Sequence, residues 1–542
     1  FLIDAPTQVG RDVSLVSGSW RETEAFFFGQ DTWHASNRLT IDAGLRWELY
    51  LPATASRPGR YSNYDPSQNL LVIAGIDGNP ANLGRETYYK YFAPRLGAAY
   101  RATDKTVLRA GFGISYEPFT NNQYAFNFPI RQNQGTSQGN SFALPTFSNG
   151  LQGNFPNGFP APTVPVISSS GTVLPASGDP YNVIDKHFQE PYVESYNFSI
   201  QQSLPGSFVM EVAYVGNHGV KIPVAYNLNA ALAPSLCTAA QIASLSAGCK
   251  ATGIPGVTPQ GADCTIGNST RPLCNQFGRT AATTFLFKPT VSNYNSLQAR
   301  LDHKFKNGFL LTTAYTWAKA LAYRSDMNAD DGAPDNYLDF QRNYGPTSRN
   351  HTHSFVQSYV YELPFGKNKH FLNSGPASWI LGGWGVSAVL TRQSGAPLHF
   401  TASGTNLAAN GSTQYPVQIA PFHVLGGIDS QPWFDTSAFC QPTVAGCPVT
   451  QNGVLGNMRR YQFSGPGLFN LDASLSRNFA ITEKTGLEFR AEAFSITNTP
   501  HFSNPSTSLT SSTFGRITGT NDQGSNVGDG NRVVELSARF TF

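Results

Sequence analysis

The sequence predicts an all-β fold, an antiparallel β-barrel that crosses a membrane. Two observations lead to it: amphipathic segments with a period of two recur along the chain, and short turns alternate with long connections between them. In addition, no apolar stretch approaches the roughly 18 residues that a membrane-spanning helix needs. Backbone groups find no water in the hydrocarbon region of a bilayer, so a membrane chain without such helices has to form a closed barrel.

The composition excludes several other classes of protein. Of the 542 residues only 13% are charged, while 13% are aromatic and glycine and proline are abundant. A mean hydropathy of −0.26 fits neither a helical membrane protein nor a disordered chain. The net charge of +3, with no basic run, gives no reason to expect nucleic acid as a partner.

The clearest amphipathic segment is Arg38–Tyr50. Its odd positions are apolar, as at Leu45 and Trp47, and its even positions carry charge, as at Asp42 and Arg46. About a dozen residues is the length that a tilted strand needs to cross a bilayer, and it is long for a strand of a soluble protein. The same alternation recurs in four further segments, residues 106–116, 295–305, 468–477 and 532–542.

The charged residues of these strands, and those of residues 488–492, share the face opposite the apolar one. In a barrel that face meets the lumen, and we expect it there for Asp42, Arg46, Glu48, Arg109, Arg300, Asp302, Glu488, Arg490 and Glu492. Both signs of charge are present. A mixture favours a wettable wall whose charges balance over a strongly ion-selective pore.

The connections alternate in length. The short ones are residues 35–37, 102–105, 205–207, 306–308 and 479–484. The long ones are residues 51–90, 118–190, 217–290, 321–350, 395–465 and 498–530. Short periplasmic turns opposite long extracellular loops are typical of outer-membrane barrels, and counting gives about thirteen strands. A slip in the alternation near Ala493 and Phe494 suggests a β-bulge.

The odd count indicates that further strands precede this stretch. The first residues, FLIDAPTQVG, read as the middle of a segment and not as a signal peptide. We therefore expect residues 1–20 to be the remnant of a preceding loop or strand. Residues 21–542 would then be the C-terminal part of a larger barrel.

The final strand ends on an aromatic residue. Val534, Leu536, Phe540 and Phe542 lie on one apolar face of the last strand. A closing strand of this kind resembles the signal that barrel-insertion machinery reads, with Phe540 and Phe542 as its main residues. The alternative is an ordinary last strand that ends on phenylalanine.

The cysteines fall into neighbouring pairs in loops rich in small and polar residues. The spacing is not that of CxxC motifs and no histidine cluster accompanies them, so loop disulfides in an oxidising compartment are favoured over zinc. Proximity predicts the pairs Cys237 with Cys249, Cys264 with Cys274, and Cys440 with Cys447.

Few residues suggest other chemistry. A calcium site is conceivable in an acidic loop, at Asp326, Asp330, Asp331 and Asp335. The spacing does not match an EF-hand, which favours a solvated acidic loop. His351 and His353 have no cysteine or carboxylate at metal-ligand spacing beside them, so hydrogen-bonded histidine is favoured over a metal site. The glycines at 382, 383 and 385 are expected on a strand, where they would allow close strand packing. We expect neither a cofactor nor enzymatic activity.

Several stretches resemble the barrel of TonB-dependent receptors of the Oar-like type. They include FFFGQDTWHASNRLTIDAGLRWE (26–48), YFAPRLGAAYRATDKTVLRAGFGISYEPF (91–119), YNSLQARLDHKFKNGFLLTTAYTWAKAL (294–321) and FRAEAFSITNTPHF (489–502). Further stretches are HSFVQSYVYELPFGKNK (353–369), WILGGWGVSAVLTRQSGAPL (379–398) and NLDASLSRNFAI (470–481). The resemblance covers nearly the whole chain, on strands and turns.

The resemblance implies a 22-stranded barrel with an N-terminal plug, driven by the inner-membrane TonB–ExbB–ExbD complex. Plug and TonB box are absent from these residues, so coupling would run through a preceding part. The implied function is uptake of an unidentified extracellular substrate across the outer membrane of a Gram-negative-type bacterium, with membrane lipid and the barrel-insertion machinery as further partners. The alternatives are a non-transporting surface barrel, adhesin-like or structural, and a soluble β-sandwich or propeller. The last of these leaves the long apolar strand faces unexplained.

Overall fold

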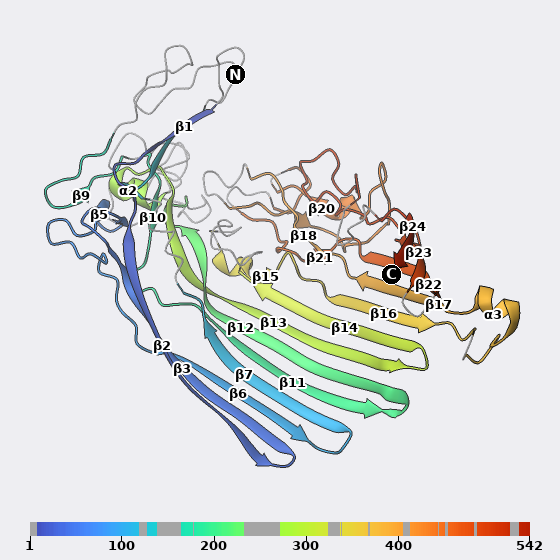
Figure 1. Ribbon diagram of the computed structural model, residues 1–542. Helices are drawn as coiled ribbons and strands as arrows, with labels where there is room; N and C mark the ends of the chain where they lie inside the picture. Colours follow the sequence, from blue (N-terminus) through green and yellow to red (C-terminus); the bar gives the residue numbers. More distant parts are fainter. Residues whose placement is uncertain are drawn as a thin grey trace.

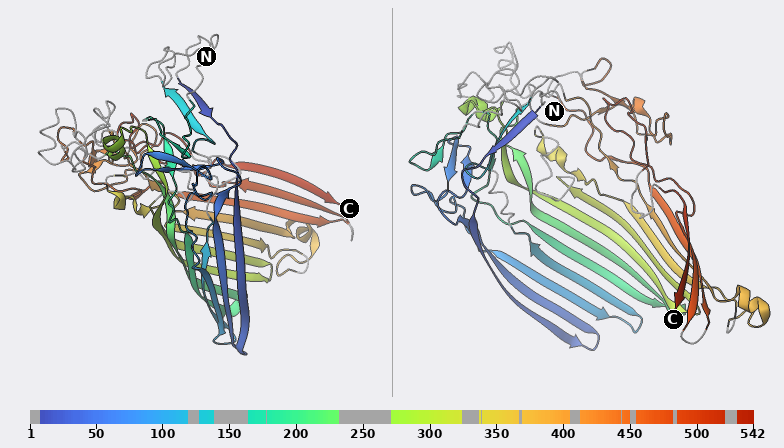
Figure 2. Two further views of the ribbon diagram at one scale, coloured as in Figure 1. Left: turned by 90° about the vertical axis from the view of Figure 1, so that its left-hand side faces the viewer. Right: turned by 45° about the horizontal axis from the view of Figure 1, so that its top comes forward.

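The structure is a computed structural model of the 542-residue chain (Figure 1). It describes residues 8–118, 127–137, 164–176, 178–231, 271–323, 337, 339–366, 369–404, 412–442, 444–449, 454–481, 485–520 and 530–542. Its main feature is one curved antiparallel sheet, with packed loops gathered at one end of its strands (Figures 1 and 2).

The main sheet follows the order of the chain. Each strand pairs antiparallel with the membrane-length strand that precedes it and the one that follows. The described path holds thirteen strands, which agrees with the number counted from the sequence. They are β2 (Trp20–Ser36), β3 (Leu39–Ala55), β6 (Tyr91–Arg101), β7 (Thr106–Tyr116), β11 (Tyr192–Leu204), β12 (Phe208–Asn227), β13 (Thr283–Lys306), β14 (Phe309–Ala322), β16 (His353–Glu362), β17 (Trp384–Gln393), β22 (Leu468–Ala480), β23 (Gly486–Phe494) and β24 (Val533–Thr541).

The register carries the predicted alternation across the whole sheet. Directly opposed residues of an antiparallel pair lie on the same face. One such row runs through Ala43, Leu96, Phe112 and Tyr196. Near the other edge Leu475, Ala491 and Leu536 are opposed in the same way. The side chains of this apolar face are open to their surroundings, as at Leu96 (54% exposed), which is what a wall in contact with lipid requires.

Several short turns lie where the sequence predicts them. Asn307 and Gly308 join β13 to β14, with φ of 54° and 78°. Two residues with positive φ form the turn that matches the twist of a hairpin, and Asn-Gly is its preferred sequence. The turn between β11 and β12 is the short helix η2 (Pro205–Ser207), and residues 102–105 join β6 to β7.

One connection at the short-turn end departs from the prediction. Between β16 and β17 the chain forms α3 (Gly375–Leu381), and Gly382 and Gly383 precede β17 where the sequence predicts strand. A Cβ on Gly382 would lie 2.5 Å from the Cα of Gly366. These glycines therefore permit a close crossing of two loop segments and do not space two strands. The irregularity expected near Ala493 and Phe494 lies just beyond them: β23 keeps its register up to Phe494, and then Ser495 has a φ of 46° and the Ile496 N–H donates to the Leu471 carbonyl, one residue out of that register.

Two central strands extend well beyond the predicted segments. β13 has 24 residues and β12 has 20, so β13 spans roughly 80 Å at about 3.3 Å per residue. The extra length lies at the long-loop end. There the pairing of the two strands shifts register once between Val220 and Ile222 and once between Val224 and Tyr226. Bulges of this kind bend and twist a strand, which carries the sheet over into the loops.

The long loops fold into packed caps. The N-terminal cap is formed by β4 (Ser62–Asp65), β5 (Leu70–Ile73), β9 (Thr172–Val173), β10 (Tyr181–Val183) and α2 (Pro272–Phe277). The C-terminal cap contains β18 (Pro397–Leu398), β19 (Val417–Gln418), β20 (Phe439–Cys440), β21 (Phe463–Ser464) and η6 (Thr436–Ala438). The remaining elements are β1 (Gln8–Val13), paired with β8 (Gln132–Ser137), and β15 (Gly345–Pro346) with η4 (Phe340–Asn343).

The caps stand at the same end of the sheet, one over its first strands and the other over its last (Figures 1 and 2). Among the described residues, no helix is long and apolar enough to cross a membrane.

Candidate functional site

The polar face of the main sheet is the first candidate surface. Its rows run through the same strand pairs as the apolar rows, shifted by one residue, for example from Asp42 through Gly97 and Gly111 to Asn197. All nine residues predicted to face a lumen lie on this one face, in four groups along the sheet. They are Asp42, Arg46 and Glu48; Arg109; Arg300 and Asp302; and Glu488, Arg490 and Glu492.

Most of these charges are matched by a neighbour two residues away. Arg46 lies 2.8 Å from Glu48, and Arg300 lies 2.8 Å from Asp302. Arg490 is shared between Glu488 at 2.9 Å and Glu492 at 3.6 Å. The other two have polar partners, Arg109 with Gln201 at 2.8 Å and Asp42 with the Thr32 hydroxyl at 2.7 Å. The face is therefore wettable and locally balanced in charge.

The alternation also places charged residues on this face that the sequence reasoning passed over. Asp472 accepts from the Asn470 amide at 3.1 Å and from the backbone N–H of Ser495 at 2.8 Å. Arg95, Glu211, Glu535 and Arg539 belong to the face as well, by their opposed residues. Extending the period of two along each strand would have found them.

An aromatic cluster adjoins the balanced charges where β3 and β6 reach the long-loop end. Glu48 is buried and accepts from the Tyr50 hydroxyl as well as from Arg46. The Tyr50 ring meets that of Tyr91 at 5.5 Å, and the guanidinium of Arg46 stands 4.5 Å from the Phe26 ring. Rings combined with buried hydrogen-bonding groups can hold a ligand by stacking and by directed polar contacts.

A buried cation holds the N-terminal cap together. Arg279 is fully buried between the rings of Tyr64 at 4.9 Å and Tyr181 at 5.2 Å. Its guanidinium donates to the carbonyl oxygens of Ala176 at 3.1 Å and Asp179 at 2.6 Å. Burial lowers the pKa of Arg279 and raises the pKa of both tyrosines. The cation remains charged because the pKa of an arginine starts so high.

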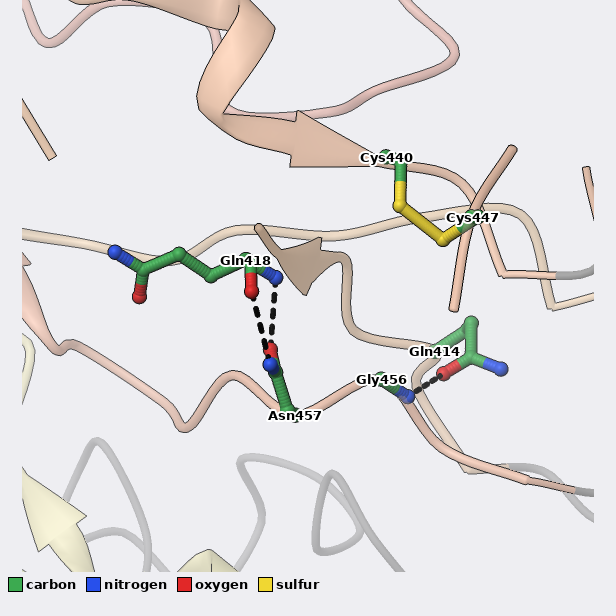
Figure 3. Close-up of a disulfide and its surroundings, with 6 residues drawn as sticks. All are labelled: Gln414, Gln418, Cys440, Cys447, Gly456 and Asn457. Carbon is green, nitrogen blue, oxygen red and sulfur yellow. Dashed lines mark hydrogen bonds between the residues drawn. A yellow bond between two sulfur atoms is a disulfide. The ribbon is translucent and has the colours of Figure 1, made fainter. Parts of the chain in front are cut away.

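The C-terminal cap has a core of phenylalanines. The Phe400 ring lies 4.9 Å from that of Phe439 and 5.3 Å from that of Phe434. Hydrogen bonds between side chains and backbone connect the segments around this core. The Gly456 N–H donates to Gln414 Oε1 at 3.0 Å, and the Asn457 side chain donates to the carbonyl of Gln418 and accepts from its N–H (Figure 3). Arg342 of η4 donates to the carbonyl of Met458 at 2.8 Å, which ties the loop after β14 to this cap.

A disulfide joins Cys440 and Cys447 within the same cap (Figure 3). Cys274 is disulfide-bonded too, at the edge of the N-terminal cap. The other predicted disulfide residues, Cys237, Cys249 and Cys264, lie outside the described residues, and so do the calcium candidates Asp326, Asp330, Asp331 and Asp335. Within the described parts of the chain no group of three potential metal ligands occurs.

The two histidines that are two residues apart have separate partners. His351 Nδ1 lies 2.7 Å from the carbonyl oxygen of Ser394, and His353 Nδ1 lies 2.8 Å from the Tyr315 hydroxyl. The hydrogen-bonded interpretation of these residues fits this arrangement.

The last strand is the edge of the described sheet, and its C-terminal residues lie at the short-turn end. Phe540 is 54% exposed and Phe542 is 97% exposed, with their rings stacked at 6.2 Å. Both aromatic rings are thus accessible, which is the condition for recognition by another protein. Their role as an assembly signal stays a prediction.

Comparison with known proteins gives a family and a set of distant structural likenesses. Residues 1–535 match the model of the family described as outer membrane beta barrel domain. No curated protein matches the sequence. Similar solved structures include the ferripyoverdine receptor of Pseudomonas aeruginosa, at 10% identity and a TM-score of 0.40, with 96% of this chain and 38% of that chain covered.

Two further structures are comparable. The siderophore receptor PiuA from Acinetobacter baumannii has 8% identity and a TM-score of 0.37, with 96% and 43% covered. The outer membrane transporter YddB from Escherichia coli has 8% identity and a TM-score of 0.43, with 96% and 54% covered. This chain therefore spans between 38% and 54% of the length of the three.

The family model covers nearly the whole chain, and it fits the apolar wall, the polar face and the uneven connections. The protein belongs to the outer membrane beta-barrel domain family and resides in the bacterial outer membrane.

Proposed function

We propose that this chain forms part of the wall and the substrate-binding loops of a TonB-dependent receptor of the Oar-like type. The observation that carries the proposal is the polar face, which crosses thirteen strands and on which seven of the nine predicted charged residues form ion pairs with near neighbours. Such a surface suits a wide water-filled lumen. It does not suit the packed interior of a small barrel.

The edges of the sheet support a barrel larger than the described strands. Within the described residues, β2 and β24 each pair with one neighbour in the main sheet. An unpaired edge in lipid leaves backbone groups without partners, so the two edges need further strands between them. We propose a 22-stranded barrel in which residues 21–542 form the C-terminal part. Residues 1–20 would belong to the preceding connection.

The loop caps are the proposed site of first contact with substrate. Their described parts draw on the long connections predicted to be extracellular, namely 51–90, 118–190, 217–290, 395–465 and 498–530, and Arg342 joins the described part of 321–350 to the C-terminal cap. A substrate held there would pass along the polar face, and the TonB–ExbB–ExbD complex would supply the energy through a plug encoded ahead of Phe1.

Two experiments test the transport proposal. The coding sequence ahead of Phe1 should contain a signal peptide, a TonB box and a plug. In cells that express the complete protein, photoreactive groups in the C-terminal domain of TonB should cross-link to it. A reading frame that opens just before Phe1, or a complete protein that never cross-links to TonB, would contradict the transporter proposal.

The second candidate is a non-transporting surface barrel that displays its loops. The observation in its favour is that each cap has a hydrophobic core of its own and a disulfide-bonded cysteine, as a display surface would. This candidate predicts no contact with TonB. It also predicts that replacing the C-terminal cap by a short turn abolishes attachment of cells to a surface or to each other while the barrel still assembles.

A further inference from the structure

An arginine lies on the apolar face near the long-loop end of β17. Arg392 is directly opposite Phe355 of β16 and Phe469 of β22, so its side chain belongs to the face in contact with lipid. It is exposed, and it forms no hydrogen bond or ion pair with the residues that the structure describes. A lone cation on a lipid-facing wall is costly unless it reaches the membrane boundary or meets an anion.

A cavity of about 760 Å³ lies beside this arginine on the same face. Much of its wall is apolar or aromatic, and its polar groups gather next to the strand ends. Arg392 borders it together with Tyr315, His353, Phe355, Leu390 and Phe469. A pocket with one cation at the rim and apolar side chains along the wall matches an amphiphile.

The cavity is held in shape by close backbone contacts. A Cβ on Gly395 would lie 1.9 Å from the carbonyl oxygen of Gly465, and one on Gly467 would lie 2.8 Å from that of Gln393. The segments after β17 and before β22 are therefore packed directly against each other. The Ser394 N–H donates to the carbonyl oxygen of His353 at 2.8 Å, and the Ser394 hydroxyl accepts from the His353 N–H at 3.0 Å.

His353 supplies a second polar group. Its Nδ1 lies 2.8 Å from the Tyr315 hydroxyl, and the two rings are stacked at 6.1 Å. When the hydroxyl donates to Nδ1, the neutral imidazole carries its proton on Nε2 and can donate it to an anion.

A second arginine on the same face, at the short-turn end, can be compared with Arg392. Arg477 also lies on the apolar face, opposite Phe489, but the structure satisfies it internally. It donates to the carbonyl oxygens of Trp379 and Ile380 at the end of α3, and it stands 3.9 Å from the Phe479 ring. The protein thus covers one cation of this face with its own backbone and leaves Arg392 beside an open cavity.

A lysine near Arg392 extends the difference between the two ends of this face. Lys319, two residues beyond Trp317 on the same face of β14, is exposed and borders a neighbouring cavity of about 490 Å³. It too has no ion pair with the described residues. Both uncovered cations therefore lie at the long-loop end, where anionic groups of the adjoining leaflet are found.

We propose that this pocket binds a phosphorylated lipid of the membrane leaflet at the long-loop end. The planar guanidinium of Arg392 suits a phosphate oxygen pair, and His353 adds a second donor. The acyl chains pack along Leu390, Phe355 and Phe469. The site serves the outer wall of the barrel and is independent of transport through the lumen.

Native mass spectrometry of the complete protein, purified in a mild non-ionic detergent, tests the site. The wild-type protein should retain a phosphorylated lipid, and Arg392→Gln should lower the retained amount about tenfold, because a charge-assisted bidentate contact is lost. Arg95→Gln is the matched control, since it removes an exposed arginine from the polar face of the same sheet. It should retain the lipid as the wild type does.

Three more measurements keep the test decisive. Heat-modifiable migration shows that each variant is folded, and His353→Gln should weaken retention by a smaller factor even if Arg392→Gln assembles poorly. Excess inorganic phosphate should leave the lipid bound. Equal retention by the wild type and Arg392→Gln, an equal loss in Arg95→Gln, or complete displacement by inorganic phosphate would each overturn the proposal.

Discussion

Arg279 shows how a single side chain organises a loop that the sequence presents as irregular. Its guanidinium joins β4, β10 and the segment after α2, since it lies between Tyr64 and Tyr181 and donates to two carbonyl oxygens. Charge-assisted bonds to buried carbonyls are stronger than neutral ones, and the stacked rings add a cation–π contribution.

Replacing this arginine should loosen the N-terminal cap alone. In Arg279→Met the carbonyls of Ala176 and Asp179 lose their donor, and we expect local opening of the cap to become about 2–4 kcal/mol easier. Hydrogen exchange at β5 and β10 measures this, with β19 and β20 as internal reference. Arg57→Met, at an exposed loop position, should change nothing. Unaltered protection at β10 in Arg279→Met would contradict this role for the guanidinium.

The Cys440–Cys447 disulfide closes a short loop in the other cap. With a sequence separation of 7, the chain-entropy model assigns it about 2.5 kcal/mol. The double variant Cys440→Ser, Cys447→Ser should therefore make the C-terminal cap more sensitive to limited proteolysis, while the N-terminal cap keeps its cleavage pattern. Cleavage rates that stay equal to those of the wild type would show that side-chain contacts such as Gln418 with Asn457 suffice.

At the scale of the element, each membrane strand presents a lipid face and an aqueous face. Ala299 and Gln298 are neighbours in β13, and the register places Ala299 on the apolar face and Gln298 on the polar face. This pair allows a comparison at one depth in the membrane, because the two positions differ mainly in the side of the wall.

An arginine should therefore have opposite consequences at these two positions. We expect Ala299→Arg to lower the free energy of unfolding by about 2–4 kcal/mol, the cost of a cation on a lipid face near the bilayer midplane. Gln298→Arg, which faces water, should cost less than about 1 kcal/mol. Urea unfolding of the complete protein in lipid vesicles measures both. Similar losses for the two variants would mean that the faces are assigned wrongly.

The last strand offers a prediction about assembly. Phe542 is almost fully exposed at the end of β24, so its removal costs little packing. If insertion machinery reads this residue, Phe542→Ala should reduce the folded, heat-modifiable protein in the outer membrane several-fold at equal synthesis. Phe371→Ala, another exposed phenylalanine at the short-turn end, is the control. Equal amounts of folded protein in all three would leave Phe542 as an ordinary terminal residue.

At the scale of the whole molecule, the open edges of the sheet predict that further strands pair with it. Among the described strands the outer edge of β2 has no partner in the main sheet. In the complete protein a further strand should pair there, so the β2 amides that point away from β3 should exchange with solvent as slowly as those of β12. Exchange of these amides at the rate of an unstructured peptide would rule out a closed barrel at this edge.

Much of the wall was predictable from the sequence. The period of two identified both faces, and register then placed all nine predicted polar-face charges together. The short turns 102–105 and 205–207 were located correctly too, and Asn307-Gly308 was included in one. These features depend on residues close in the chain or on a fixed alternation, which a linear pattern records. The glycines before Trp384 were misplaced because their close contact is with Gly366, in a separate segment.

The packing of the two caps could not be predicted from alternation along the sequence. The Asn63 amide donates to the carbonyl of Ile184, 121 residues away, and Arg460 donates to that of Ala322, 138 residues away. Their cores assemble from short apolar runs in loops that show no periodicity. The same holds for the pocket at Arg392, which needs four strands in register and two glycine contacts.

The sequence by itself thus determined the architecture of the wall: antiparallel strands, one face for lipid, one face for water, and long connections at one end. Alternation along a strand decides these because successive side chains point to opposite faces of a sheet. Only the tertiary structure decided which loops pack together, how far β12 and β13 extend, and that Arg392 is left uncovered while Arg477 is not. Those outcomes depend on contacts between segments far apart in the chain, and no local pattern encodes them.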